Sequence, residues 1–522
     1  MKPPGGRLAP VPEEAGSAQT PTPPRTAGDT APSGIRLFVD SDGNPIPLPP
    51  EIWTDLYPAA KALILHLLEE NRALRARVDA LEERLRTNST NSSKPPSSDP
   101  PGTRRKKKRG SGRHRGGQKG HPGHYRELVP VDQVDHVVPH FPSHCERCSQ
   151  AIDPTPHGEP IRHQVSDFPP VRITITEHQR HHVKCLRCGH VSTAEHPKGV
   201  PTGVVGPRLM AVDSLMTTRF RMSRRDCELF NELFFGMTWS LGTVKRVENT
   251  VSQALSPAYN ELARYVRRCP VLGMDETPWK EDNKKSYVWN ANDSTLSLYK
   301  IAPHRDTATA RAIVGGDFDG ALVTDRLASY DFQADKKRQH CLAHLDRDFE
   351  KIAERGGESQ AIGEWGHREL GHVFKLYRRF KANEIDRSQM QEELKPIRAR
   401  MGRLLHRGAD LDQPQQEKKH QKTARTCKKI LDKFDCLWVF AFIEGVETTN
   451  NSSEQAVRPA VRLRRVSFGS QSKSGSRFVE RMLTAVETCR RQGRNVLDYV
   501  AGCIDALLND TPTPSLLPKP DG

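Results

Sequence analysis

The sequence predicts a multidomain α+β protein, and three observations predict it. A heptad pattern lies near the start of the chain, two Cys-x-x-Cys pairs follow it, and short apolar runs that end in acidic residues come later. At 522 residues the chain is long enough for about three domains, on a prior of roughly 150 residues each. We therefore expect several folded units along the chain.

The charge balance favours a polyanionic partner. The chain has 80 Lys and Arg against 64 Asp and Glu, a net charge of +16, which is typical of proteins that bind nucleic acid. No apolar run approaches the roughly 18 to 20 residues of a membrane span, and the Pro-rich start lacks the apolar core of a signal peptide. We expect a cytoplasmic, DNA-associated protein with no membrane partner and with its 11 cysteines reduced.

The first two segments are a leader and a heptad helix. Residues 1–48 are rich in Pro, Gly, Ala and Thr, which predicts a disordered leader. Residues 50–87 predict a leucine-zipper coiled coil with its seam at Ile64, Leu67, Asn71, Leu74, Val78, Leu81 and Leu85. A lone Asn71 in such a seam favours a two-stranded parallel coil, and hence a homodimer. The alternative is an amphipathic helix that packs on its own domain.

Residues 88–125 form a polar and basic linker. Its densest charge run is Arg104, Arg105, Lys106, Lys107, Lys108 and Arg109. Such a run is expected to contact DNA phosphates without distinguishing bases, and to make binding depend on salt. The alternative is a solvated linker without a partner.

Residues 126–200 predict a zinc-binding ribbon. Its ligands are two Cys-x-x-Cys pairs separated by 36 residues, namely Cys145, Cys148, Cys185 and Cys188. Val171, Ile173 and Ile175 alternate with polar residues and predict a strand between the pairs, while Gly189 permits a tight turn after the second pair. Four thiolates leave zinc no open position, so this Zn²⁺ is structural. A dithiol redox pair or unrelated core cysteines are the alternatives.

Residues 201–268 predict a helical DNA-binding region. The helical pattern is interrupted at Met222 and Ser223 and at Gly236, and Ser240 is expected to cap a third helix. Lys245 and Arg246 lie on the first turns of that helix, so the layout resembles a helix-turn-helix. A plain helical bundle is the alternative.

Residues 269–510 predict an α/β domain. Strands are expected at 271–280, 286–292 and 296–302, followed by a helix near 307–314 and a strand that ends at Asp325. This order is typical of a ribonuclease H-like mixed sheet. Residues 346–442 are expected to form a largely helical insertion, and residues 511–522 a tail.

Three acidic residues of this domain lie at positions where metal ligands are expected. Asp275 and Asp325 each end a buried apolar run, and Glu454 follows the helix-capping residues 450–453. Such acids suit a pair of hard divalent cations. Any one of them alone more often caps a helix or joins a surface ion pair. Glu276 is expected to point away from Asp275, and His344 is expected to be a satisfied core histidine rather than a phosphate ligand.

Several motifs together carry a family resemblance. They are the zipper with its polar linker, Gly-Gln-Lys-Gly-His-Pro-Gly-His at 117–124, the two cysteine pairs, Gly-Met-Asp-Glu-Thr at 273–277, Asp-Arg-Leu-Ala-Ser-Tyr at 325–330, Cys-Leu-Ala-His at 341–344 and Asn-Asn-Ser-Ser-Glu-Gln-Ala-Val-Arg-Pro at 450–459. Over nearly its full length the chain resembles transposases of the insertion sequence 66 family. The sequence departs from the usual pattern at Thr449, Gln455 and Leu342.

The resemblance implies that Asp275, Asp325 and Glu454 are a catalytic triad that binds Mg²⁺ or Mn²⁺. Two such ions, about 3.5 to 4 Å apart, would activate water at a transposon end and then the freed 3′-hydroxyl for attack on target DNA. Arg458 and Arg462 share a helix face with Glu454 and could hold phosphates. Companion transposition proteins are possible partners. The alternatives are a catalytically silent zinc-ribbon regulator and a nuclease that cuts without joining.

Overall fold

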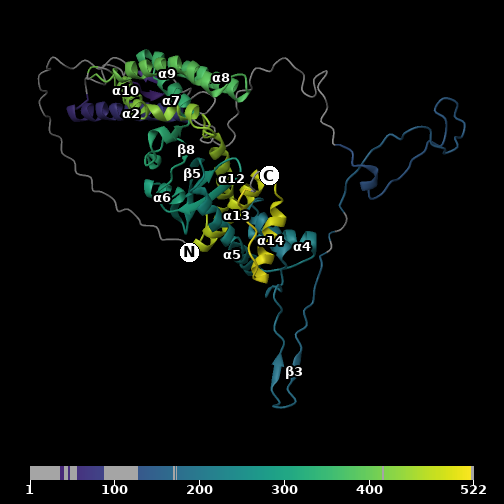
Figure 1. Cartoon of the computed structure of the whole chain (residues 1–522). Helices are drawn as coiled ribbons and strands as arrows, with labels where there is room; N and C mark the ends of the chain where they lie inside the picture. The colour runs from purple at the N-terminus through teal and green to yellow at the C-terminus, as the bar shows by residue number, and fades with distance from the viewer. Residues whose placement is uncertain are drawn as a thin grey trace, which may run out of the picture. The chain divides into compact units, whose positions relative to one another are not determined.

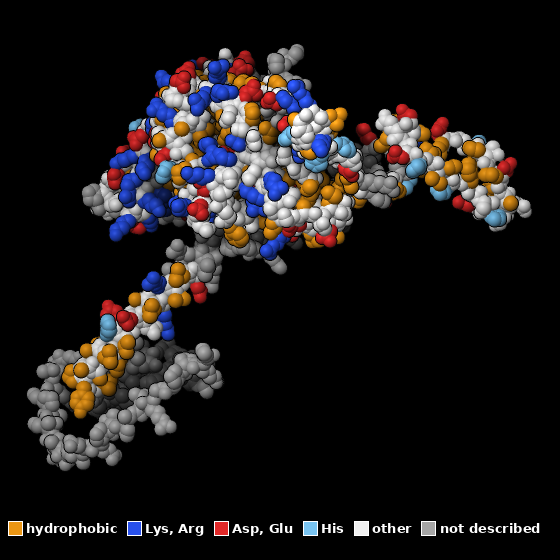
Figure 2. Space-filling view, turned by 90° about the horizontal axis from the view of Figure 1, so that it is seen from below, with side chains coloured by type: hydrophobic (Ala, Val, Ile, Leu, Met, Phe, Trp, Pro, Cys, Tyr) orange, Lys and Arg blue, Asp and Glu red, His pale blue; other side chains and the backbone are white. Residues whose placement is uncertain are grey.

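The computed structural model describes residues 36–39, 45–47, 56–86, 127–168, 171, 173–413, 415 and 417–518 (Figure 1). The chain divides into two units, residues 1–106 and 107–522. No helix in these ranges has the length and apolar character needed to cross a membrane. Lys and Arg side chains are spread over much of the face shown in Figure 2, with acidic side chains between them.

The first unit contains a hairpin and a long helix. Strands β1 (Arg36–Val39) and β2 (Pro45–Pro47) pair antiparallel, so the leader predicted as disordered includes a short hairpin. Helix α2 (Pro58–Arg86) is continuous over the predicted zipper. Its seam residues Leu67, Leu74, Val78 and Leu81 are exposed, and Leu74 is 59% exposed. The basic run at 104–109 lies outside the described residues.

The cysteine-containing segment differs from the expected ribbon. Its described elements are a short 3-10 helix, η2 (Val131–Gln133), and an antiparallel hairpin of β3 (His182–Lys184) and β4 (Val191–Thr193) around the second cysteine pair. The strand expected through Val171, Ile173 and Ile175 is wrong, because the described residues there pair with no other strand and Ile175 is 82% exposed. Alternation alone does not make a strand without a neighbour to pair with.

Three helices follow, and their ends agree with the sequence. They are α3 (Pro207–Thr218), α4 (Arg224–Phe235) and α5 (Leu241–Val266). Ser223 forms a capping box with Asp226, Gly236 ends α4 with a φ of 65°, and Ser240 accepts the N–H of Thr243. The predicted interruptions and the predicted cap are therefore confirmed.

A five-stranded mixed sheet forms the centre of the second unit. Its strands are β5 (Val271–Glu281), β6 (Lys284–Asn292), β7 (Ser297–Ala302), β8 (Ala321–Thr324) and β9 (Arg338–His340), in the order β7-β6-β5-β8-β9. The first three strands pair antiparallel, whereas β8 and β9 run parallel to β5. Helix α6 (Thr307–Val314) connects β7 to β8, and the short 3-10 helices η3 (Ala328–Tyr330) and η4 (Asp335–Lys337) lie between β8 and β9. The fold is thus mixed α+β with a sheet core.

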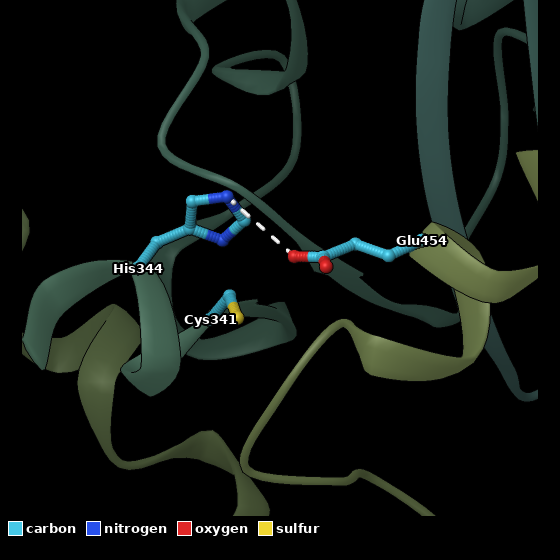
Figure 3. A group of neighbouring side chains, drawn as sticks. All are labelled: Cys341, His344 and Glu454. Atoms are coloured by element: carbon cyan, nitrogen blue, oxygen red, sulfur yellow. Dashed lines mark ion pairs between the residues drawn. The ribbon is translucent and has the colours of Figure 1, made fainter. Parts of the chain in front are cut away.

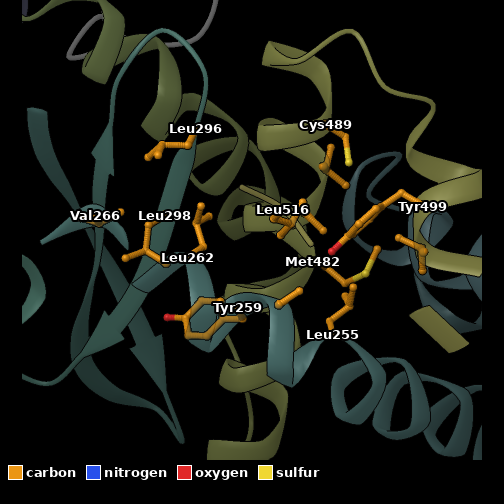
Figure 4. Packing of buried hydrophobic residues seen from close by; sticks show 14 of the residues in the cluster. Leu255, Tyr259, Leu262, Val266, Leu296, Leu298, Met482, Cys489, Tyr499 and Leu516 are labelled. Atoms are coloured by element: carbon orange, nitrogen blue, oxygen red, sulfur yellow. The ribbon is translucent and has the colours of Figure 1, made fainter. Parts of the chain in front are cut away.

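Helices cover both faces of the sheet (Figure 1). Leu272, Met274 and Leu322 pack in one core with α5, α13 (Lys473–Arg491) and α14 (Val496–Asn509). Figure 4 shows Leu262 of α5, Met482 of α13 and Tyr499 of α14 in this core. Ala321 and Val323 pack in a second core on the other face. Because successive strand residues point to opposite faces, alternate positions of β5 and β8 serve the two cores.

The second core belongs to helices that follow β9. They are α7 (Leu342–Ala353), α8 (Gly357–Lys381), α9 (Arg387–Ala409), α10 (Lys418–Leu431), η5 (Phe434–Leu437) and α11 (Val439–Phe442). After them, α12 (Asn451–Ser467) returns to the sheet, where Ala460 and Leu463 pack with Trp279. The helical segment α7–α11 is therefore followed by a helix that packs against β5, the first strand of the sheet.

Helix α13 covers the free edge of β7. Three side chains spaced four residues apart on α13 accept the outward N–H groups of alternate β7 residues. The donor and acceptor pairs are Ser297 with Thr488, Tyr299 with Thr484, and Ile301 with Glu480. The edge strand thus has its donors satisfied, which closes it to pairing with another chain.

Candidate active site

Asp275 and Asp325 occupy matching positions on neighbouring parallel strands. The pairing of β5 with β8 runs from Val271 opposite Ala321 to Gly273 opposite Val323. Each aspartate comes two residues after the last of these pairs. The topology therefore brings the two predicted acids to the same level of adjacent strands. Asp275 lies within β5, which continues to Glu281, whereas Asp325 directly follows the end of β8.

Glu454 is held near this edge by the start of α12. The Nδ2 of Asn450 donates to the carbonyl of Met274 at 3.0 Å, and the Nδ2 of Asn292 donates to the Oγ of Ser453 at 2.9 Å. A Cβ on Gly273 would lie 2.2 Å from that Oγ, so glycine is needed for this close approach. Asn450 is the residue that caps α12, but its side chain makes no cap bond and instead fixes the helix to β5.

Asp275 is largely buried near the other two acids. Burial raises the pKa of Asp275 well above its usual range, and the negative charges of Glu276, Asp325 and Glu454 add to that rise. The N–H of Glu276 opposes it by donating to Asp275 at 3.0 Å. Among the described residues, the oxygens of the triad do not all lie within 4.8 Å of one another. The acids share one site without forming a closed cluster.

Glu454 faces His344 on α7 (Figure 3), and it also pairs with Arg347 of the same helix. Its Oε1 lies 3.6 Å from the Nε2 of His344 and 3.5 Å from the guanidinium of Arg347. The Sγ of Cys341 completes a group whose possible metal-binding atoms lie within 4.8 Å of one another. That thiol accepts the N–H of Asn450 at 3.2 Å and burial raises its pKa, so it is a neutral thiol packed between helices rather than a thiolate ligand.

His344 is not the satisfied core histidine that the sequence suggested. Its Nδ1 is buried and has no hydrogen-bond partner among the described residues. Burial and the charge of Arg347 lower the pKa of His344, so the imidazole is neutral beside Glu454. The missed signal is position: His344 lies in the first turn after β9, whose carboxyl end meets the edge that carries Asp325.

Buried Arg338 fixes the backbone around Asp325. Its Nε donates to the Oγ1 of Thr324 at 3.1 Å, and one Nη donates to the carbonyls of Asp325 and Leu327 at 3.0 and 2.8 Å. The other Nη pairs with Asp331. The N–H of Leu327 donates to the Oδ1 of Asp325 at 3.0 Å. The position of Asp325 thus depends on one arginine that the sequence did not single out.

Glu276 points away from Asp275, as the strand alternation predicts. It accepts a hydrogen bond from Arg305 at 2.7 Å and another from the hydroxyl of Tyr330. Burial raises its pKa although these two donors oppose the rise. Glu276 is therefore committed to Arg305 and Tyr330 rather than free to bind a metal.

The predicted DNA-binding side chains differ in availability. Lys245 lies 3.5 Å from Glu248, whose carboxylate also accepts from Arg224. The exposed residues Arg246, Arg458 and Arg462 pair with no acid in the part of the chain that the structure describes. Three of these four cations remain open to a phosphate.

The two cysteine pairs form matching turns. In each, the N–H of Ser149 or Gly189 donates to the carbonyl of the first cysteine, at 2.8 and 2.9 Å. Both of these residues have positive φ, 57° and 74°. N–H groups of the second cysteine and of the arginine before it lower the pKa of the Cys145 and Cys185 thiols. The four sulfur atoms do not form one close group among the described residues.

A comparison with protein families gives the class. Residues 203–477 match a transposase family. The chain therefore has the role of a transposase, a class of DNA-processing enzymes that bind DNA. The matching family is described as Transposase IS66 family, and because the match covers more than half of the chain, the chain belongs to that family. Residues 50–127 match a family of unknown function (DUF6444). No curated protein matches the chain.

Proposed function

We propose that Asp275, Asp325 and Glu454 are the metal-binding triad of a transposase that cleaves transposon ends and transfers the freed strand into target DNA. One observation carries the proposal. Two aspartates occupy matching positions on adjacent parallel strands, and the charge of Glu454 acts on one of them. Such a set of oxygen ligands suits divalent cations in phosphoryl transfer.

The strand arrangement supports a ribonuclease H-like catalytic domain. Three antiparallel strands are followed by a helix and two strands parallel to the first. Asp275 lies on the first strand and Asp325 directly follows the fourth, which agrees with the acid positions that the sequence predicts for that fold. The helices α7–α11 stand between the fifth strand and the helix that carries Glu454.

The residues fit a divalent cation. The Oε1 of Glu454 is buried without a hydrogen-bond partner, and the pKa of Asp275 is raised by burial and then by neighbouring carboxylates. Both features cost free energy in the folded protein, and a bound cation would remove that cost. When bound at the triad, Mg²⁺ or Mn²⁺ would polarise the scissile phosphate and lower the pKa of the attacking water or 3′-hydroxyl.

The chain's own groups orient the substrate and the acids. Arg338 holds the Asp325 loop, and Asn450 holds the start of α12. The neutral imidazole of His344 can donate a hydrogen bond to a phosphate oxygen. Arg458 and Arg462 are exposed on the helix that carries Glu454 and are proposed to hold phosphates of the scissile strand.

We also propose a structural Zn²⁺ bound by Cys145, Cys148, Cys185 and Cys188. The N–H groups that face the first sulfur of each pair support thiolate ligands. Zinc content of the purified protein tests this proposal. Zinc should be present in the wild type and lost in Cys148→Ser and Cys188→Ser, and equal zinc in all three would contradict it.

The triad is tested by cleavage and joining assays on DNA that carries the gene's own flanking sequence. Wild type is compared with Asp275→Asn, Asp325→Asn and Glu454→Gln, and Asp346→Asn is the matched control because Asp346 pairs with the exposed His367 outside the triad. The three triad variants should bind DNA without reacting, while the control reacts like wild type. Binding without any reaction by wild type would favour a regulator, and cutting without joining would favour a nuclease.

A further inference from the structure

A basic groove lies beside the Asp325 loop. It has a volume of about 920 Å³ and is bounded by that loop, by α7 and by α10. Its cationic lining consists of Arg326, Lys351, Arg355, Lys422, Lys429 and Lys433. We call this cavity the α7–α10 groove.

Six cations outnumber the four acids that line the groove, which are Asp331, Asp348, Glu354 and Asp432, and two of these acids are paired with cations. Asp348 pairs with both Arg326 and Lys351. Asp331 pairs with Arg338, which lies beneath the loop. The remaining positive charge therefore favours an anionic occupant.

The cations of α10 form one stripe. Lys422, Thr426 and Lys429 recur at intervals of four and three residues, so they share one face of the helix. Lys422 and Lys429 are exposed and form no ion pair among the described residues. Two turns of helix separate them, about 10 Å, so they can contact different phosphates of one strand.

His340 supplies an independent observation at the floor of the groove. It is only 4% exposed, it lines the groove, and its Nε2 is buried without a hydrogen-bond partner. An unpaired buried polar atom is costly, and a polar ligand that reached this nitrogen from the groove would remove that cost. Burial lowers the pKa of His340 to about 3, so the ring is neutral and donates as an imidazole.

The groove begins at the candidate active site. Arg326 follows Asp325 in the chain, and His340 lies opposite Thr324 in the sheet. Asp348, on the groove wall, is close enough to act on the pKa of His344. A strand that leaves the triad in this direction enters the groove directly.

We propose that the α7–α10 groove holds a single DNA strand that continues from the scissile phosphate, with Lys422 and Lys429 on its phosphates and His340 as a hydrogen-bond donor. The inference rests on the proposed function. The volume is in the range of small-molecule pockets, which suits a few nucleotides of one strand rather than a duplex. The phosphate contacts carry no sequence preference.

The test measures how salt affects the binding of full-length protein to end DNA with a single-stranded extension. Wild type is compared with Lys422→Ala/Lys429→Ala and with Lys375→Ala/Arg403→Ala, a pair of exposed cations on α8 and α9 that do not line the groove. Losing two single-strand phosphate contacts should reduce the slope of log affinity against log salt by about 1.4. The control pair should keep the wild-type slope.

The other outcomes distinguish a failure of the groove inference from a failure of the transposase proposal. If wild type cuts DNA but the groove variant and the control have equal slopes, the groove inference fails and the transposase proposal stands. If wild type neither binds nor cuts DNA, both fail. If ATP displaces the extension from wild type and binds the groove variant more weakly, the groove is a nucleotide site and the strand assignment is wrong.

Discussion

At the scale of single residues, the site depends on side chains that support the acids. Asp275, Asp325 and Glu454 were predicted because an apolar run before each aspartate and capping residues before the glutamate are local signals. The roles of Arg338 and His344 depend on which strands are neighbours, and no local pattern carries that information. The departure Leu342 is fully buried in the second core, where an apolar residue fits.

Replacing Arg338 should lower both the stability of the protein and its cleavage activity. Arg338→Met removes the donors that hold the Asp325 loop, so the free energy of unfolding should fall by about 3 kcal/mol and cleavage should fall with it. Chemical denaturation and a cleavage assay measure the two effects. The neighbouring Lys337→Ala breaks a pair with the exposed Asp319 and should cost at most about 1 kcal/mol. Equal losses in both variants would contradict this role of Arg338.

The close approach of Gly273 to Ser453 leads to a prediction for two single variants and their combination. Gly273→Ala places a methyl group against the Oγ of Ser453, so α12 should shift and cleavage should fall. Adding Ser453→Ala removes that oxygen and should restore part of the activity. Cleavage rates of the two single variants and the double variant test this coupling. Independent effects in the double variant would mean that the contact does not position Glu454.

At the scale of elements, the sequence predicts where the strands lie along the chain, but it does not predict which strands pair with one another. The ends of α6 and the starts of β5 and β8 agree with apolar runs and capping residues in the sequence. The strand order places β8 beside β5, and that neighbour relation depends on long-range packing. The expected strand at Val171 to Ile175 is absent among the described residues because its alternation meets no partner strand.

Glu480 on α13 makes stability depend on pH. Burial raises its pKa to about 7 in the folded protein, so its contribution is fully present below about pH 4.5 and is lost as pH rises through 7. The shift corresponds to roughly 3 kcal/mol. Denaturation of Glu480→Gln and wild type between pH 4.5 and 8 should show the variant gaining relative stability as pH rises. A constant difference across this range would contradict the raised pKa.

At the scale of the whole molecule, the family match covers the sheet, α7–α11 and α12, so it includes all three acids. The heptad helix, the linker and the cysteine pairs precede that match. The heptad pattern, the charge run and the cysteine spacing predict the nature of these segments, and that prediction remains to be tested. A coiled-coil partner or a bound DNA cannot be predicted in detail from local patterns, because each depends on contacts outside the chain.

The exposed seam of α2 predicts a dimer. Leu74→Lys places a charge in that seam and should convert a dimer into a monomer, as measured by light scattering on full-length protein. Asn71→Leu should change the assembly state or its stability, because Asn71 is expected to fix the register. The matched control is Arg72→Ala, at an exposed position outside the predicted seam. An assembly state that is the same in all of these proteins would count against the coiled coil.

The central claim is that the three acids bind the catalytic cations. Electron paramagnetic resonance can count the Mn²⁺ bound to the protein with its end DNA, in wild type and in Asp275→Asn, Asp325→Asn and Glu454→Gln. We expect about two Mn²⁺ ions in wild type and fewer in each variant. Unchanged Mn²⁺ binding in all three variants would contradict the assignment of the site.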